Sequence, residues 1–149
     1  MYGLAADKRS AKNNTPACRK EYIKKRVDNG IPIGLLAYAG GKAVTWHSIG
    51  PKDSQNNSLG GNTALENMWS LTCLFVFPEY REKGVTHLLI EYAKEYAKSN
   101  GAHYLEAYPV ERDSPSYRHM GFVEPFEKEG FLFTGMAGSR RNIILCELL

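Results

Sequence analysis

The most regular pattern of apolar and polar positions lies between residues 69 and 101. The uninterrupted apolar run 69–77 has the length and the aromatic and β-branched content of a strand buried on both faces. Pro78 ends this strand, because proline cannot donate to a sheet. A helix follows and ends at Asn100-Gly101, a typical left-handed cap. Helical spacing predicts an inward face made of Val85, Leu88, Leu89, Tyr92, Ala93, Tyr96 and Ala97.

The chain before residue 69 predicts one helix and one hairpin. Thr15-Pro16 is typical of an N-cap followed by proline in the first turn, and Asn29-Gly30 ends that helix. Two strands, 31–39 and 42–49, then flank a turn at Gly40-Gly41. His47 in the second strand is expected to be structural.

The chain after residue 101 completes the predicted sheet. Strand 103–110 follows a strand and a helix, so we expect it to lie parallel to strand 69–77 through a right-handed crossover. The remaining predicted elements are a short helix at 114–120, strands at 122–126 and 142–148, and a further short strand at 131–133.

Composition restricts the class of protein. The 149 residues, 43% hydrophobic and 23% charged, predict a single soluble domain over 1–149, with residues 1–14 a mobile or non-standard N-terminus. A net charge of +3 does not favour a dedicated nucleic-acid binder. No apolar run is long enough for a membrane span or a signal peptide, and the three cysteines have no metal-site spacing, so we expect a cytoplasmic protein without a metal.

Two regions leave alternatives open. The basic residues of helix 16–28 form either a solvated outer face or a docking surface for an acidic partner. The Gly- and Asn-rich connection 50–67 is either a loop beside a substrate or plain disorder.

The segment 81–86, at the start of the helix, has the chemistry of an anion site. A helix start leaves backbone N–H groups unpaired and carries partial positive charge, and Gly84 lets a phosphate approach the backbone. Arg81 and Lys83 add formal positive charge. Neither GxGxxG nor GxxxxGK[ST] is present here, which argues against dinucleotide enzymes and P-loop kinases.

Two motifs carry a resemblance to a known family, over about residues 31–149. The segment Val76-x-Pro78-x-Tyr80-Arg81-x-Lys83-Gly84-Val85 resembles the central R/Q-x-x-G-x-G/A motif of the GNAT superfamily of acetyl-CoA-dependent N-acetyltransferases, although Thr86 stands where the family has Gly or Ala. The segment Tyr117-Arg118-His119-Met120-Gly121-Phe122 resembles the family's Y-x-x-x-G-F.

The resemblance implies an α/β (α+β) fold: a mixed, mostly antiparallel twisted sheet with a central parallel strand-helix-strand unit. It also implies transfer of an acetyl group from acetyl-CoA to a primary amine of a small molecule or peptide. Tyr117 would be the proton donor to the leaving thiolate. The implied cofactor residues are Leu74, Phe75 and Val76 for the pantetheine arm and Arg81, Lys83, Gly84, Val85 and Thr86 for the pyrophosphate.

The N-terminal region departs from the family pattern. A GNAT domain usually begins with a strand and two helices, whereas this chain offers one good helix before the hairpin. The usual first strand is therefore expected to be absent or replaced. The acceptor site would then be incomplete, wider, or completed by a second subunit in a homodimer.

The general base is not fixed by the motifs. Alternation in strand 103–110 places Glu106 beside Tyr104 and Tyr108, and a buried carboxylate is costly unless it is paired or has a raised pKa. Glu106 is therefore either the base or part of a structural salt bridge. Glu66, His119 and a water relay are further candidates for the base.

Two rival functions remain at this stage. One is a catalytically silent acyl-CoA-binding module with regulatory activity. The other is nucleic-acid or protein docking through residues 19–26, which predicts salt-dependent binding to nucleic acid.

Overall fold

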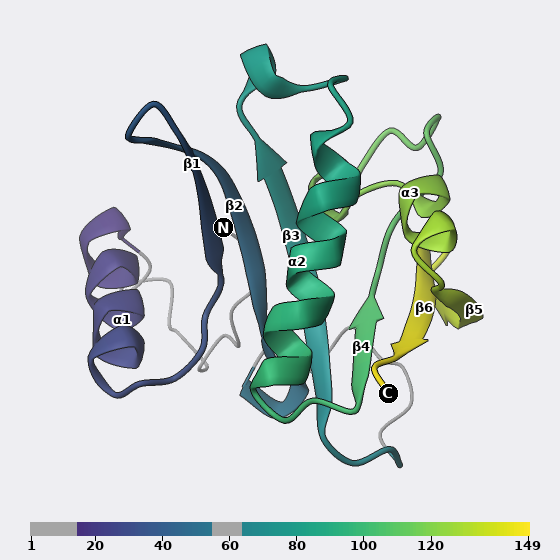
Figure 1. Ribbon diagram of the computed structural model, residues 1–149, viewed down its shortest axis with the longest axis horizontal. Helices are drawn as coiled ribbons and strands as arrows, with labels where there is room; N and C mark the ends of the chain where they lie inside the picture. The colour runs from purple at the N-terminus through teal and green to yellow at the C-terminus, as the bar shows by residue number, and fades with distance from the viewer. Residues whose placement is uncertain (1–14, 55–63) are drawn as a thin grey trace.

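The computed structural model describes residues 15–54 and 64–149, which form one six-stranded mixed sheet in the order β1-β2-β3-β4-β6-β5 (Figure 1). The predicted N-terminus 1–14 and residues 55–63 of the connection 50–67 lie outside the described residues. The strands are β1 (Leu35–Ala39), β2 (Lys42–Pro51), β3 (Met68–Val76), β4 (Tyr104–Ala107), β5 (Leu132–Ala137) and β6 (Arg141–Glu147). The helices are α1 (Pro16–Asp28), α2 (Val85–Ser99) and α3 (Val123–Lys128), with 3-10 turns η2 (Lys52–Ser54), η4 (Pro78–Tyr80) and η5 (Arg118–Met120).

The sheet confirms the predicted fold class. β3 and β4 pair in parallel across the α2 crossover, and the other neighbouring pairs are antiparallel. In the part of the chain that the structure describes, α1 is the element that precedes the β1–β2 hairpin. The expected loss of the usual first strand concerns residues 1–14, which lie outside the described residues, and it stays a prediction. None of the helices in the described ranges is both long and apolar enough to cross a bilayer.

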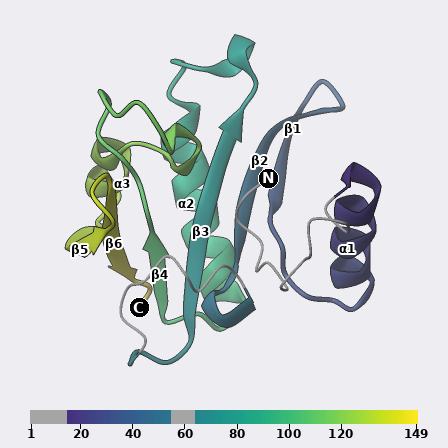
Figure 2. The same cartoon turned by 180° about the vertical axis from the view of Figure 1, so that it is seen from behind.

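The core lies between the sheet and α2, which crosses in front of β3 in Figure 1 and behind it in Figure 2. Leu71 of β3 and Ile90 and Ala93 of α2 are buried in one cluster, and Trp69 and Tyr96 pack edge to face with ring centroids 5.6 Å apart. The predicted helix face was partly wrong. Leu88 and Tyr92 are 53% and 60% exposed, and Ile90 is buried in their place, because the strip of α2 that touches the sheet is centred on Leu89, Ile90, Ala93 and Ala97.

Several predicted element ends are confirmed, and each has a local cause. The Thr15 hydroxyl accepts a hydrogen bond from the Cys18 amide at 3.2 Å and caps α1. Gly40 and Gly41 both have positive φ, as a two-residue hairpin turn requires. At the end of α2, the Gly101 amide donates to Lys98 O with Gly101 in the left-handed region.

Two predicted elements were wrong, and a third was predicted too long. The strand predicted at 31–39 is confirmed over Leu35–Ala39 but begins only at Leu35, since Pro32 has no N–H to donate to a sheet. The helix predicted at 114–120 is only the 3-10 turn η5, because Tyr117 has φ of 59° and interrupts helical geometry. In place of the strand predicted at 122–126, Phe122 is the extended N-cap of helix α3 and residues 123–126 belong to the helix, whose first turn accommodates Pro125 without losing a hydrogen bond.

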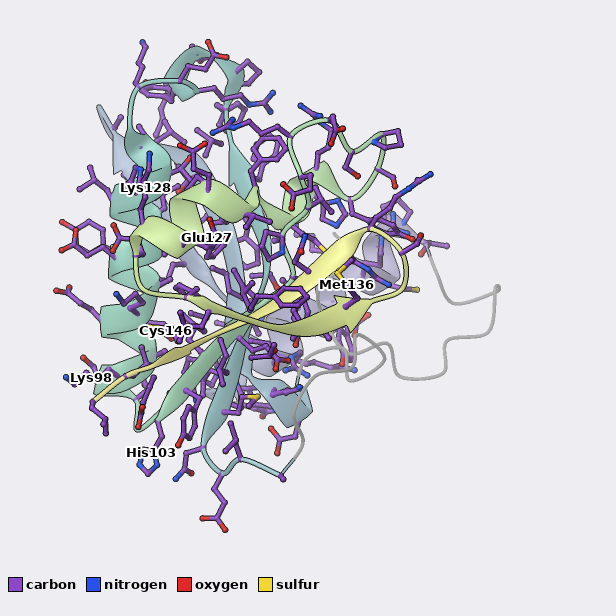
Figure 3. The ribbon with its side chains drawn as sticks, turned by 90° about the vertical axis from the view of Figure 1, so that its right-hand side faces the viewer. Lys98, His103, Glu127, Lys128, Met136 and Cys146 are labelled. Carbon is purple, nitrogen blue, oxygen red and sulfur yellow. The ribbon has the colours of Figure 1, made fainter. Side chains whose placement is uncertain are left out.

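The expectation that β3 is buried on both faces holds only for its first half. Met68 to Thr72 are buried, whereas Phe75 near the other end is exposed. The short strand predicted at 131–133 exists as the longer β5, which is an edge strand. Figure 3 looks onto that edge, where Met136 is labelled, and β5 presents the exposed side chains of Leu132, Phe133 and Met136.

Candidate functional site

The central feature of the site is the point where β3 and β4 separate. β4 pairs with β3 only from Met68–Tyr104 to Leu71–Ala107, while β3 continues to Val76 with β2 as its partner. Beyond β4 the chain turns towards η5 and β6, and the two paths diverge towards the top of Figure 1. We call the place where the two paths separate, beside residues 72–76 of β3, the wedge. On this side, the backbone edge of β3 beyond Leu71 pairs with no other strand of the described residues.

A β-bulge lies where the wedge begins. Leu71 pairs with Ile49 and Cys73 pairs with Ser48, so Thr72 is the extra residue on β3. A bulge bends a strand and increases its local twist. The bulge therefore changes the direction of β3 next to the first residues that β4 no longer covers.

The loop before α2 has the backbone geometry of an anion site. Gly84 is the N-cap of α2 with φ of 72°, and no side chain caps this end of the helix. Glu82 is also left-handed, with φ of 59°. A Cβ added at Gly84 would meet no atom of the protein within 4 Å, so the backbone of Gly84 borders open space. The first amides of α2, including those of Val85 and Thr86, have no intrahelical acceptor because they lie in the first turn.

The two basic side chains of this loop are both exposed. Arg81 turns back along β3: its Nε donates to Val76 O at 2.8 Å, and its guanidinium lies 5.9 Å from the Phe75 ring centroid. Lys83 Nζ lies 5.9 Å from the Tyr80 ring centroid. Both residues precede α2 in the same exposed loop, and the Arg81 side chain bridges to the end of β3.

Tyr117 lies at the start of η5, and this segment packs against β3. A Cβ at Gly121, which ends η5, would be 3.1 Å from Leu74 Cδ1, so η5 lies beside the uncovered half of β3. The Tyr117 ring is 42% exposed and carries the Arg141 guanidinium 4.6 Å from its centroid. The structure therefore brings the Tyr117 segment and Leu74 together at the wedge.

Glu106 is at the centre of a buried polar cluster. Its side chain is 0% exposed, and its Oε1 accepts hydrogen bonds from Lys52 Nζ and from the Tyr108 hydroxyl, both at 2.6 Å. Ser70 Oγ lies 3.2 Å from the same Tyr108 hydroxyl. Burial, and next the neighbouring Glu106, raises the pKa of Tyr108, so this hydroxyl stays protonated and donates. The salt bridge that sequence reasoning left open is thus present, and its partner is Lys52.

Sequence reasoning missed two members of this cluster. Lys52 follows β2 in a loop-like stretch, and no periodic signal connects it to Glu106. Ser70 occupies the position on β3 opposite Glu106, which only strand register reveals. Tyr108 was detectable, because alternation along the predicted strand 103–110 places it on the same face as Glu106.

The other candidate bases lie in different places. Glu66 is exposed and lies just before the start of β3, whereas the wedge is at the far end of that strand. Since Met68 and Leu74 are already about 20 Å apart along the strand, Glu66 is far from the wedge. His119 belongs to η5 on the wedge side, and burial lowers its pKa, which favours the neutral imidazole.

Comparisons with known proteins agree with this geometry. No curated protein sequence matches the chain significantly. Among solved structures, a GNAT acetyltransferase from Streptococcus pneumoniae is similar over 91% of this chain and 77% of its own, with a TM-score of 0.63 and 19% identity. The Salmonella typhimurium protein yncA, solved with its cofactor acetyl-CoA, has a TM-score of 0.59 and 16% identity over 88% of this chain and 72% of its own.

A third similar structure is the PaiA N-acetyltransferase from Thermoplasma acidophilum in complex with coenzyme A. Its TM-score is 0.58 at 18% identity, over 93% of this chain and 80% of its own. The family model described as "Acetyltransferase (GNAT) domain" matches residues 17–139, which is most of the chain. The resemblance of the two motifs, the parallel β3–β4 unit and this match agree: the chain belongs to the GNAT family of acetyltransferase domains.

Proposed function

We propose that this protein transfers an acetyl group from acetyl-CoA to a primary amine of a small molecule or peptide. The observation that carries the proposal is the wedge beyond Leu71, where an uncovered strand edge lies next to the uncapped N-terminus of α2. Two similar proteins were solved with acetyl-CoA and coenzyme A, which supports the same class of cosubstrate here.

The residues present fit the phosphate end of acetyl-CoA. The amides of Gly84, Val85 and Thr86 would hold the pyrophosphate, since they lie at a helix N-terminus with open space at Gly84. Arg81 and Lys83 would add charge to this contact. The Thr86 side chain does not block Gly84, because a Cβ at Gly84 would meet nothing within 4 Å.

The end of β3 would hold the pantetheine arm and orient the thioester. Leu74, Phe75 and Val76 offer backbone groups on the edge that β4 leaves uncovered. An N–H donor on this edge would stabilise the negative charge that develops on the thioester carbonyl oxygen. When bound, acetyl-CoA supplies an activated acetyl group.

Proton transfer would involve Glu106 and Tyr117. An acceptor ammonium loses two protons on becoming an amide: Glu106 would take one, and Tyr117 would give one to the leaving thiolate and be reprotonated with the second. The free amine forms the new C–N bond as the C–S bond breaks, and Glu106 then releases its proton to solvent. Because the Glu106 side chain is fully buried, we place a water molecule between it and the acceptor.

A second candidate is an acyl-CoA-binding module without catalysis. The observation in its favour is that Glu106 Oε1 is already engaged by Lys52 and Tyr108, as in a structural ion pair. Such a module would bind acetyl-CoA through the same loop and strand edge.

The decisive experiment is calorimetric titration of the purified protein with acetyl-CoA and with CoA, followed by a thiol-release assay across a panel of primary amines. Micromolar binding with amine-dependent thiol release supports the acetyltransferase. Binding without release for any amine favours the silent module. Absence of binding contradicts both.

A further inference from the structure

The two oxygens of the Glu106 carboxylate have unequal surroundings. Oε1 accepts both short hydrogen bonds, from Lys52 Nζ and from the Tyr108 hydroxyl. Oε2 is equally buried and has no hydrogen-bond partner among the described residues. A buried carboxylate oxygen without a donor is costly, so such an atom points to a donor that a ligand or a bound water supplies.

The donors to Oε1 are themselves fixed. Lys52 is 8% exposed and begins η2, a turn that Ser54 closes by donating its hydroxyl to Pro51 O at 2.9 Å. Arg26 Nη2 of α1 donates to Ser54 O at 2.9 Å and ties the same turn to the helix. The turn that carries Lys52 is therefore held by α1 from outside the sheet, while Tyr108, the first residue after β4, holds Oε1 from the other side.

This arrangement also connects Glu106 to the wedge. Tyr108 packs in one buried cluster with Met120, the last residue of η5, and Tyr117 immediately precedes η5. Glu106, the proposed proton acceptor, and Tyr117, the proposed proton donor, are thus connected through Tyr108 and the η5 turn.

We propose that Lys52 and Tyr108 are positioning residues, which hold Oε1 of Glu106 and leave Oε2 as the atom that receives the proton of the acceptor amine. The inference rests on the proposed function. The proton passes from the ammonium to the intervening water as that water gives its own proton to Oε2, so charge and protons balance. Lys52 also compensates the carboxylate charge in the protein interior.

The test compares Lys52→Met, Lys52→Arg and Tyr108→Phe in the thiol-release assay, using the amine with the highest turnover in the panel. Lys94→Met is the matched control, because Lys94 Nζ also ties two segments, donating to Glu129 O at 2.7 Å outside this cluster. We expect Lys52→Met to lower kcat at least tenfold, with the acetyl-CoA Kd unchanged within twofold. Lys52→Arg should recover kcat to within about threefold of wild type. Tyr108→Phe should lower kcat three- to tenfold.

A purely structural ion pair predicts a different result. Lys52→Met would then behave like Lys94→Met, with lower thermal stability and unchanged kcat, and the inference would be overturned. If Lys52→Met does not fold, Tyr108→Phe decides, since it removes only a hydroxyl; an unchanged kcat overturns the inference. A wild-type protein that acetylates no amine overturns the proposed function and this inference with it, whereas an active wild type with unimpaired variants overturns the inference alone.

Discussion

Lys52 and Glu106 are 54 positions apart in the sequence, and their side chains form an ion pair of 2.6 Å in the protein interior. Loss of one member leaves the other as an uncompensated buried charge, whereas loss of both does not. The pair is therefore tested best by measuring how the two substitutions combine.

We expect Lys52→Met to lower the free energy of unfolding by about 3 kcal/mol. The double variant Lys52→Met/Glu106→Gln should lose clearly less than the sum of the two single losses, because neither charge remains buried alone. Urea denaturation at pH 7 measures all three. Lys24→Met, which breaks the exposed 2.7 Å pair with Asp28, is the control and should change little. Additive losses would show that the two residues do not interact energetically.

Gly84 and Gly101 offer a matched pair at the two ends of α2. Both have positive φ, of 72° and 87°, and a Cβ at either would meet nothing within 4 Å. Alanine at each position should therefore cost a similar amount of stability, about 1 kcal/mol, from backbone strain alone.

Only the Gly84 variant should affect the cosubstrate. We expect Gly84→Ala to weaken acetyl-CoA binding at least tenfold in calorimetric titration, and Gly84→Glu to abolish it through bulk and like charge. Gly101→Ala should bind as wild type does. Equal affinities for the two alanine variants would place the pyrophosphate away from the α2 N-terminus.

His47 predicts a pH dependence of stability. It is 2% exposed, and neither ring nitrogen has a hydrogen-bond partner among the described residues. Burial lowers the pKa of His47 from 6.5 to about 4. The unfolded chain therefore binds a proton more readily between these values, and the stability that is complete above pH 6.5 is lost as the pH falls towards 4.

The His47→Leu variant should remove this loss. Urea denaturation at pH 7 and at pH 5 measures the free energy of unfolding at each pH. Between these two pH values, the wild type should lose about 2 kcal/mol more of this free energy than the variant does, because one group with a shifted pKa titrates. Leucine suits the site, since Leu35 and Leu74 are the strand neighbours of His47. Parallel pH profiles for the two proteins would mean that His47 reaches a proton acceptor in the folded state.

Tyr117→Phe isolates the proposed proton donor. The substitution keeps the ring beneath Arg141 and removes the hydroxyl, so we expect kcat to fall about 100-fold with little change in the acetyl-CoA Kd. Steady-state thiol release measures kcat, and calorimetry measures the Kd. Tyr92→Phe, on the exposed side of α2, serves as the control. A Tyr117→Phe variant with wild-type kcat would assign the donor role to another group.

The local elements could be predicted where one short segment carries its own physical cause. Gly84 and Gly101 mark the ends of α2, and Gly40-Gly41 forms the hairpin turn, because each needs a positive φ that glycine adopts freely. The apolar run of β3 and the helix after it predicted the parallel β3–β4 pair through the handedness of the crossover. Prediction failed at Phe122–Phe126, where apolar content suits a strand and a buried helical turn equally well.

The sequence by itself determined the strand-loop-helix unit and the candidate residues on it, since backbone propensity and the spacing of apolar residues act within a few positions. Only the tertiary structure decided what surrounds Glu106. The position of Lys52 depends on where β2 ends, how η2 turns and how Arg26 of α1 holds that turn, and each of these is a contact between segments distant in the chain. Ion pairs in a protein interior are selected by packing and by the cost of burying charge, and neither leaves a periodic pattern in the sequence.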